Sequence, residues 1–216
     1  MEFMCKLFDG VRIDHFRAIE SYFSIPANET TAKNGKWVKG PDMALFRQFK
    51  KDICEDLPII AEDLGMLFDS VRDLLAYTGY PGMKILQFAF YDDDAEYLPR
   101  VYPHSNCVVY SGSHDADCTK SWIKNLSESA VKARFKKECP SRKGQSRTYD
   151  VIELAMSSIA NLAVIPMQDY LGLGGHARIN LPSTLGNNWK WRMKPESCTP
   201  ELAERIRNLC ELYGRV

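Results

Sequence analysis

The feature that most constrains the fold is an alternation of short apolar segments with longer helical ones along the 216-residue chain. Strands are predicted over residues 10–14, 57–65, 82–94, 106–117 and 162–169, and helices over 43–56, 70–79 and 148–161. Strands alternating with helices form parallel β/α units, and strands apolar throughout lie in a sheet covered on both faces. A (β/α)₈ barrel and a doubly wound sheet both meet these conditions. Because the predicted strands are too few for eight, the pattern indicates a smaller α/β sheet or part of a barrel.

Cap signals bound the helix predicted over 70–79. Asp69 stands where an N-cap side chain would accept a backbone hydrogen bond, and Gly79 stands where a left-handed C-terminal cap would follow. We therefore predict that this helix begins after Asp69 and ends at Gly79.

Three of the predicted strands run into acidic residues at their carboxyl ends. Asp14 ends the segment GVRID, Glu62 follows the run PIIA, and Asp115 comes shortly after CVVY. If the strands are neighbours, their carboxyl ends share one edge of the sheet, and we expect the three carboxylates to converge there. Two carboxyl groups about 5 Å apart suit retaining glycosyl chemistry, with one as nucleophile and the other as acid and then base. Arg12, two residues before Asp14 on the same side of the strand, would favour its charged form. Each acid taken alone could instead cap a helix or form a structural ion pair.

A metal site is the competing interpretation of the same segments. The side chains that could act as ligands are His15, Glu62, Asp63, His114, Asp115 and Asp117. No HExxH or other compact ligand spacing is present, so we predict that the chain binds no metal. His15 and His114 are then expected to donate hydrogen bonds to a substrate or to pack against neighbouring strands.

Two other motifs need an interpretation. GLGGHA, residues 172–177, has the glycine spacing of a phosphate-binding loop, but Pro182 and Gly186 prevent a following helix, so we predict a turn. Trp189 and Trp191, in NNWKWR, could stack on a sugar or a base, but we expect them to pack the domain as aromatic anchors.

The composition indicates which partners the protein does not bind through its overall charge and in which cellular compartment it is expected. The 28 basic and 28 acidic residues cancel, so no global charge attracts nucleic acid or an anionic membrane. No signal peptide is visible, and the sequence has no run of about 18 apolar residues, which a membrane span would require. The 7 cysteines are scattered without CxxC spacing, which is typical of a reducing compartment, and we expect a cytoplasmic protein.

Seven long motifs follow one another along the chain: VRIDHFRAIESYFSIP, GKWVKGP, PIIAEDLG, GYPGMKILQFAF, YSGSHDADCTKSW, IPMQDYLGLGGHARINLP and NNWKWR. In this order they resemble the motifs of the 4-α-glucanotransferases, also called amylomaltases or disproportionating enzymes, glycoside hydrolase family 77. The resemblance implies a (β/α)₈ TIM barrel that transfers α-1,4-glucan segments between maltooligosaccharides with retention of configuration and without a cofactor. A retaining α-glucan hydrolase and a non-catalytic, truncated glucan-binding protein remain alternatives.

The resemblance also implies roles for particular residues. Asp14 matches the nucleophile of the family, Glu62 the general acid/base, and Asp115 the acid that stabilises the transition state through sugar hydroxyls. Arg12 and His114 match residues that orient the nucleophile and contact the glucosyl unit.

His15 and Asn180 are the remaining residues expected to bind substrate. The family pattern departs at Ala18, where glycine is usual, and at Ala116 and Cys118, which replace Asn and Thr. These departures affect loop geometry and substrate fit, whereas the three acids are retained.

Members of this family carry a long region ahead of the nucleophile strand. We therefore expect residues 1–216 to be the C-terminal part of a single catalytic barrel domain, an incomplete barrel covering about strands 4 to 8. Because a barrel closes only with all its strands, the isolated chain is predicted to have little or no transferase activity.

Overall fold

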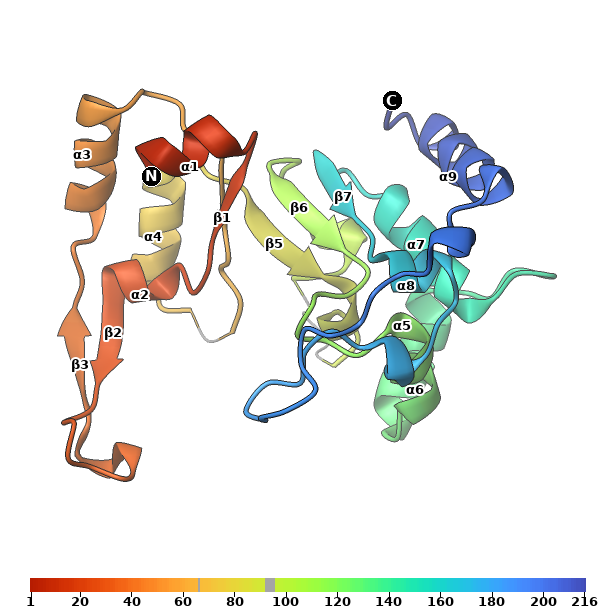
Figure 1. Ribbon diagram of the computed structural model, residues 1–216, viewed down its shortest axis with the longest axis horizontal. Helices are drawn as coiled ribbons and strands as arrows, with labels where there is room; N and C mark the ends of the chain where they lie inside the picture. The colour runs from red at the N-terminus through yellow and green to blue at the C-terminus, as the bar shows by residue number, and fades with distance from the viewer. Residues whose placement is uncertain (66, 92–95) are drawn as a thin grey trace. The chain divides into compact units, whose positions relative to one another are not determined.

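The computed structural model describes residues 1–65, 67–91 and 96–216 (Figure 1). The chain divides into two compact units, residues 1–83 and 84–216, which are described separately below. The acidic run at 92–94, predicted to end the strand over 82–94, lies outside the described residues.

The first unit is built on a parallel strand pair. Its strands and helices are α1 (Glu2–Leu7), β1 (Val11–Ile13), α2 (Arg17–Glu20), β2 (Ser21–Ser24), η1 (Ala32–Asn34), β3 (Lys36–Lys39), α3 (Met43–Asp52), β4 (Ile59–Ala61) and α4 (Asp69–Thr78). β1 pairs with β4 in parallel, with Val11 opposite Ile59 and Ile13 opposite Ala61. The amphipathic helices α3 and α4 contribute Phe46 and Leu74 to the core of this unit. The strands predicted over 10–14 and 57–65 and the helices predicted over 43–56 and 70–79 are thus confirmed, although both strands are shorter and the first helix ends at Asp52.

An antiparallel hairpin of β2 and β3 joins α2 to α3 (Figure 1). Ser21 lies opposite Lys39, and the ring of Trp37 packs edge-on against Phe23 at a centroid distance of 5.3 Å. The sequence predicted no strand over these residues. Pairing between the two segments, rather than local pattern, makes them strands.

The predicted caps of α4 are half right. The N-cap position belongs to Phe68, and Asp69 is already the first helical residue, so the prediction of Asp69 as N-cap is wrong. Its carboxylate still lies in the first turn, where the helix dipole favours negative charge. Gly79 adopts a left-handed conformation with φ 69° and its N–H bonds to the carbonyl of Leu75, which confirms the C-terminal cap.

The second unit carries a three-stranded sheet in the order β5-β6-β7. Its elements are β5 (Gly82–Ile85), which begins in the first unit, η2 (Leu86–Phe88), η3 (Pro99–Val101), β6 (Cys107–Tyr110), α5 (Thr119–Asn125), α6 (Ser129–Glu138), α7 (Arg147–Met156), β7 (Leu162–Val164), α8 (Met167–Tyr170), η4 (Gly175–Ala177), η5 (Pro195–Ser197) and α9 (Pro200–Leu212). β6 and β7 are parallel, with Val108 opposite Leu162. Helices α5, α6 and α7 pack on this sheet through a core that includes Phe90, Trp122 and Phe135.

Several boundaries differ from the sequence prediction. The strand predicted over 82–94 ends at Ile85, where the 3₁₀ turn η2 begins, and the strand predicted over 106–117 ends at Tyr110. The strand predicted over 162–169 ends at Val164, and Pro166 precedes the short helix α8, so Gln168 and Asp169 are buried helical residues rather than a strand end. The helix predicted over 148–161 ends at Met156. The turn predicted at 172–177 is confirmed, since only the single 3₁₀ turn η4 forms there.

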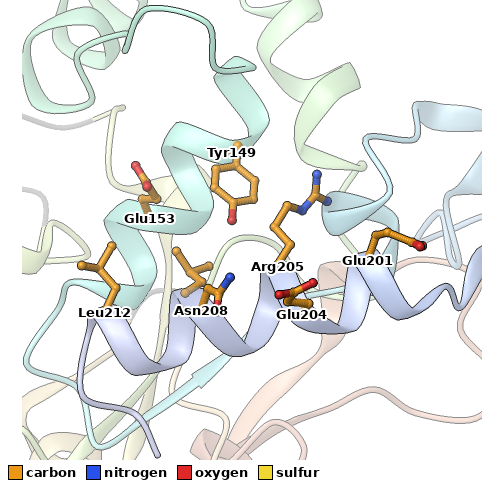
Figure 2. Close-up of a pocket in the computed structure, with 8 residues that line it drawn as sticks. Tyr149, Glu153, Glu201, Glu204, Arg205, Asn208 and Leu212 are labelled. Carbon is orange, nitrogen blue, oxygen red and sulfur yellow. The ribbon is translucent and has the colours of Figure 1, made fainter.

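Helix α9 packs on α7 in the second unit (Figure 2). Leu209 contributes to the contact, and the guanidinium of Arg205 lies over the ring of Tyr149, 5.2 Å from its centroid. An open groove of about 370 Å³ remains between the helices, and no residue predicted as catalytic or substrate-binding lines it. In the described residues, no helix has the length and apolar character needed to span a membrane.

Candidate active site

The register of β1 and β4 aligns the first two predicted acids. Ile13 lies opposite Ala61, so Asp14 and Glu62 are the next residues beyond the carboxyl ends of two paired parallel strands. The alignment continues past the strands, because the N–H of Glu62 donates to the carbonyl of Ile13 at 2.9 Å and the N–H of Phe16 donates to the carbonyl of Glu62 at 3.0 Å. The first unit therefore brings these two acids to one end of the same strand pair.

Arg12 pairs with Asp14 as the strand alternation predicts. Arg12 Nη2 lies 2.8 Å from Asp14 Oδ1, and the carboxylate side chain is 78% exposed while the arginine side chain is 28% exposed. A half-buried guanidinium thus holds a carboxylate that remains open to solvent. Such an oriented, accessible carboxylate is suited to nucleophilic attack.

The environment of Glu62 differs from that of Asp14. Its Oε2 accepts from the N–H of His15 at 2.6 Å and its Oε1 from the N–H of Leu64 at 3.0 Å. Burial raises the pKa of Glu62, the negative charge of Asp14 raises it further, and the two N–H donors and the charge of Arg12 oppose the rise. A carboxyl group that keeps its proton to higher pH beside an ion-paired carboxylate is the arrangement expected of a general acid and a nucleophile.

His15 has an unusual backbone conformation. Its φ of 47° is in the left-handed region, which a non-glycine residue adopts at some energetic cost. This conformation turns the chain after Asp14 so that the N–H of His15 points at Glu62. The His15 side chain is exposed, as a substrate contact requires.

The second unit positions the third acid. Asp115 lies in the loop beyond the end of β6 at Tyr110, and its Oδ1 accepts from Asn180 Nδ2 at 2.6 Å. His114 Nε2 lies 3.5 Å from Asp115 Oδ2. The structure therefore brings together the predicted residues His114, Asp115 and Asn180, although the asparagine is 65 residues further along the chain.

Arg178 also belongs to this cluster, and the sequence analysis did not single it out. Its Nη2 donates to the carbonyl of Asp115 at 2.7 Å, and its Nε donates to the carbonyl of Asn180 at 2.8 Å. The available signal was its position two residues before Asn180 in the ARIN segment. Arg178 fixes the main chain at Asp115 and leaves the carboxylate to Asn180 and His114.

Trp189 does not pack as the predicted aromatic anchor. Its side chain is 56% exposed, and its ring lies 5.2 Å from the ring of His114 at an interplanar angle of 37°. The expectation failed because a tryptophan in a loop has no apolar periodicity to indicate which face it covers. The ring instead flanks the cluster around Asp115.

The remaining acids considered as metal ligands have local structural partners. Asp63 is buried and its Oδ1 accepts from the N–H of Met83 at 2.7 Å, while Asp117 Oδ1 accepts from the N–H of Cys118 at 2.8 Å. Across residues 1–65, 67–91 and 96–216, no three His, Cys, Asp or Glu side chains gather in a group that could hold a metal ion.

Comparison with protein families identifies the relatives of this chain. The sequence model of glycoside hydrolase family 77, described as 4-alpha-glucanotransferase, matches residues 1–199. The chain belongs to family 77. The resemblance inferred from its motifs is thereby confirmed.

Curated relatives of this family 77 chain carry the same description. A 4-alpha-glucanotransferase of Clostridium butyricum is 46% identical over 211 residues, which are 97% of this chain and 43% of that protein. A 4-alpha-glucanotransferase of Thermus thermophilus is 41% identical over 223 residues, covering 100% of this chain and 44% of that protein. The family 77 chain thus spans less than half the length of these relatives.

A solved structure supports the family 77 assignment. An amylomaltase from Streptococcus agalactiae in complex with acarbose is 34% identical, has a TM-score of 0.91, and is matched over 97% of this chain and 42% of that one. The α/β fold predicted for the chain is therefore that of an amylomaltase over the matched part.

Proposed function

We propose that this chain carries the catalytic acids of a 4-alpha-glucanotransferase, which transfers α-1,4-glucan segments between maltooligosaccharides by a retaining double displacement. The observation that carries the proposal is the pairing of β1 with β4, which puts an ion-paired Asp14 and a Glu62 whose pKa is raised by burial at the ends of adjacent strands. Membership of family 77 and the names of the relatives support the same activity.

In the first step, Asp14 attacks the anomeric carbon of the donor glucan. The glycosidic C–O bond breaks as Glu62 gives its proton to the leaving oxygen, and a covalent glucosyl–Asp14 ester forms. The raised pKa of Glu62 suits this proton transfer, because the group must still be protonated when the donor arrives.

In the second step, the 4-hydroxyl of an acceptor sugar replaces the ester. Glu62, now ionised, takes the hydroxyl proton while the oxygen attacks the anomeric carbon and Asp14 leaves as a carboxylate. Two inversions at one carbon give net retention, and both carboxyl groups return to their starting states. Water in place of the acceptor would give hydrolysis by the same route.

Asp115 acts in this scheme by hydrogen bonding to hydroxyls of the reacting glucosyl unit. Asn180 and His114 hold its carboxylate by the contacts at 2.6 and 3.5 Å, and His114 also reaches the sugar. We assign Arg12 and His15 to substrate binding beside Asp14. The reaction needs no cofactor, because proton transfer and covalent catalysis are both supplied by carboxyl groups.

The finer structural assignment is also a proposal. We assign the strands of this chain to about strands 4 to 8 of a (β/α)₈ barrel, with residues 1–216 forming the C-terminal part of one catalytic domain. The match to less than half of each relative supports the narrower point that the chain corresponds to part of such an enzyme. We propose a cytoplasmic location from the cysteine pattern, and in the described residues all 7 cysteines are free thiols.

Exchanging the matched segment of the Clostridium butyricum relative for this chain tests the function. The chimera should convert maltotriose into glucose and a ladder of longer oligomers, whereas this chain alone should give little or none. Replacing Glu62 with Gln in the chimera should lower the rate by about 10²–10⁴-fold, and Asp14→Ala and Asp115→Asn should also lose activity. A folded but inactive chimera would refute the proposal, and shorter sugars alone would indicate a hydrolase.

A further inference from the structure

We propose that Trp189 is a sugar-stacking residue, whose exposed indole face binds a glucosyl ring of an α-1,4-glucan next to Asp115. The proposal rests on the proposed function in one respect, namely that Asp115 faces the sugar. Its own support is the exposure, the backbone conformation and the neighbours of Trp189.

The first observation is that Trp189 is exposed beside polar groups that suit a sugar. Trp189 is 56% exposed, whereas Trp122 in the same unit is only 9% exposed and packs against Phe90 and Phe135. The indole N–H of Trp122 donates to Tyr91 Oη at 3.3 Å. In the described part of the chain the indole N–H of Trp189 has no protein acceptor, so it can donate to a sugar hydroxyl.

The second observation is that the backbone holds Trp189 in a costly conformation. Its φ is 63°, in the left-handed region that glycine adopts easily and a bulky residue does not. The N–H of Trp189 donates to the carbonyl of Ile179 at 2.7 Å, and Arg192 Nη1 donates to the carbonyl of Trp189 at 3.1 Å. Backbone strain of this kind clusters at active sites and ligand-binding sites, so it supports a functional role for the side chain.

The loop before Trp189 is braced rather than loose. Asn188 Oδ1 accepts from the N–H of Leu181 at 3.0 Å, and its Nδ2 donates to the carbonyl of Thr184 at 3.1 Å. The backbone that carries Trp189 is thus held in place before any ligand arrives, which reduces the entropy lost on binding.

The third observation is the link from Trp189 to the catalytic cluster. Its ring lies 5.2 Å from that of His114, which in turn contacts Asp115. A pyranose presents apolar C–H faces and polar hydroxyl edges, so a sugar stacked on the indole would direct hydroxyls toward His114 and Asp115. This combination of a flat aromatic surface and nearby hydrogen-bonding groups fits a glucosyl unit rather than a purely apolar ligand.

The test is Trp189→Gly in the 216-residue chain, with Leu185→Gly as the matched control in the same loop. Isothermal titration with maltoheptaose should show about ten-fold weaker binding for Trp189→Gly, which loses the stacking surface. Its thermal unfolding midpoint should be no lower than that of the wild type, because glycine relieves the left-handed strain. Leu185 is fully exposed at 101%, and its replacement should leave affinity unchanged. Trp189→Phe should recover much of the binding.

Unchanged affinity of Trp189→Gly would overturn the proposal, as would a lower unfolding midpoint with the weaker binding, since that would indicate a packing role. Absence of any maltoheptaose binding by the wild-type chain would also overturn it. Trp189-dependent binding together with an inactive chimera would leave the stacking role standing and refute the glucanotransferase proposal instead.

Discussion

Replacing Asp169 should destabilise the second unit strongly, because this buried carboxylate joins the two ends of the loop that carries Asp115. Its Oδ2 accepts from Ser111 Oγ at 2.6 Å and from Thr119 Oγ1 at 2.7 Å, and its Oδ1 accepts from the N–H of Thr119 at 2.9 Å. Ser111 and Thr119 are both 0% exposed, so water cannot replace the lost acceptor.

The size of the effect follows from these three donors. In Asp169→Ala each is left without its partner inside the protein, at about 1–3 kcal/mol per group. Part of this is offset, because burial raises the pKa of Asp169, which means that its charged form is itself costly to bury. We expect a net loss of about 3–5 kcal/mol in the free energy of unfolding, a large share of the stability of an ordinary domain.

Asp169→Asn is the informative control. The amide oxygen can still accept from the Thr119 N–H, and the amide nitrogen can donate to the two hydroxyl oxygens, while the side-chain volume is kept. We expect a loss below about 2 kcal/mol at neutral pH. Since the folded-state pKa of Asp169 lies above its unfolded value, the wild type loses stability as pH rises through that interval, and Asp169→Asn should not show this loss.

Urea unfolding at several pH values measures both variants. Tryptophan fluorescence, to which the buried Trp122 of the second unit contributes, and far-UV circular dichroism both follow the unfolding of the chain. The midpoint for Asp169→Ala should fall with an unchanged slope, as expected for a loss of stability without a change in exposed surface. A loss below about 1 kcal/mol for Asp169→Ala, or equal losses for the two variants, would refute the reasoning from unsatisfied buried donors.

Three further predictions follow from other contacts. Carbon-13 NMR should place the titration midpoint of Glu62 above that of an ordinary glutamate, because burial raises its pKa. Asp14→Asn should lower this midpoint by removing a nearby negative charge, and an unchanged midpoint would contradict the proximity of Asp14 to Glu62. Gly82→Ala would put a Cβ 2.3 Å from Asp63 Oδ2, so urea unfolding should show a free energy of unfolding that is lower by about 1–3 kcal/mol. An unchanged free energy of unfolding would mean that the contact relaxes freely. Thr199 Oγ1 accepts from an N–H in the first turn of α9 at 3.2 Å, so Thr199→Ala should lower the free energy of unfolding by about 1 kcal/mol and speed amide hydrogen exchange in that turn. Unaltered exchange would argue against the cap.

The sequence by itself determined the elements whose pattern is local. The apolar runs at 59–61 and 107–110 formed strands, and the amphipathic segment at 43–52 formed a helix. Gly79 ended α4 because a residue without a Cβ adopts the left-handed conformation of the C-terminal cap without steric cost. The motifs around Asp14, Glu62 and Asp115 also sufficed to predict the family, because each is a contiguous run of residues.

Only the tertiary structure decided the features that depend on partners far away along the chain. The β2–β3 hairpin is defined by pairing, the predicted strand end at Asp169 proved to be a buried helix, and Trp189 proved to be exposed. The bond from Asn180 to Asp115 joins residues 65 apart. Local periodicity reports which face of a segment is apolar, but it carries no information on which distant donor or ring that face will contact. The geometry of the candidate site depends on such long-range contacts.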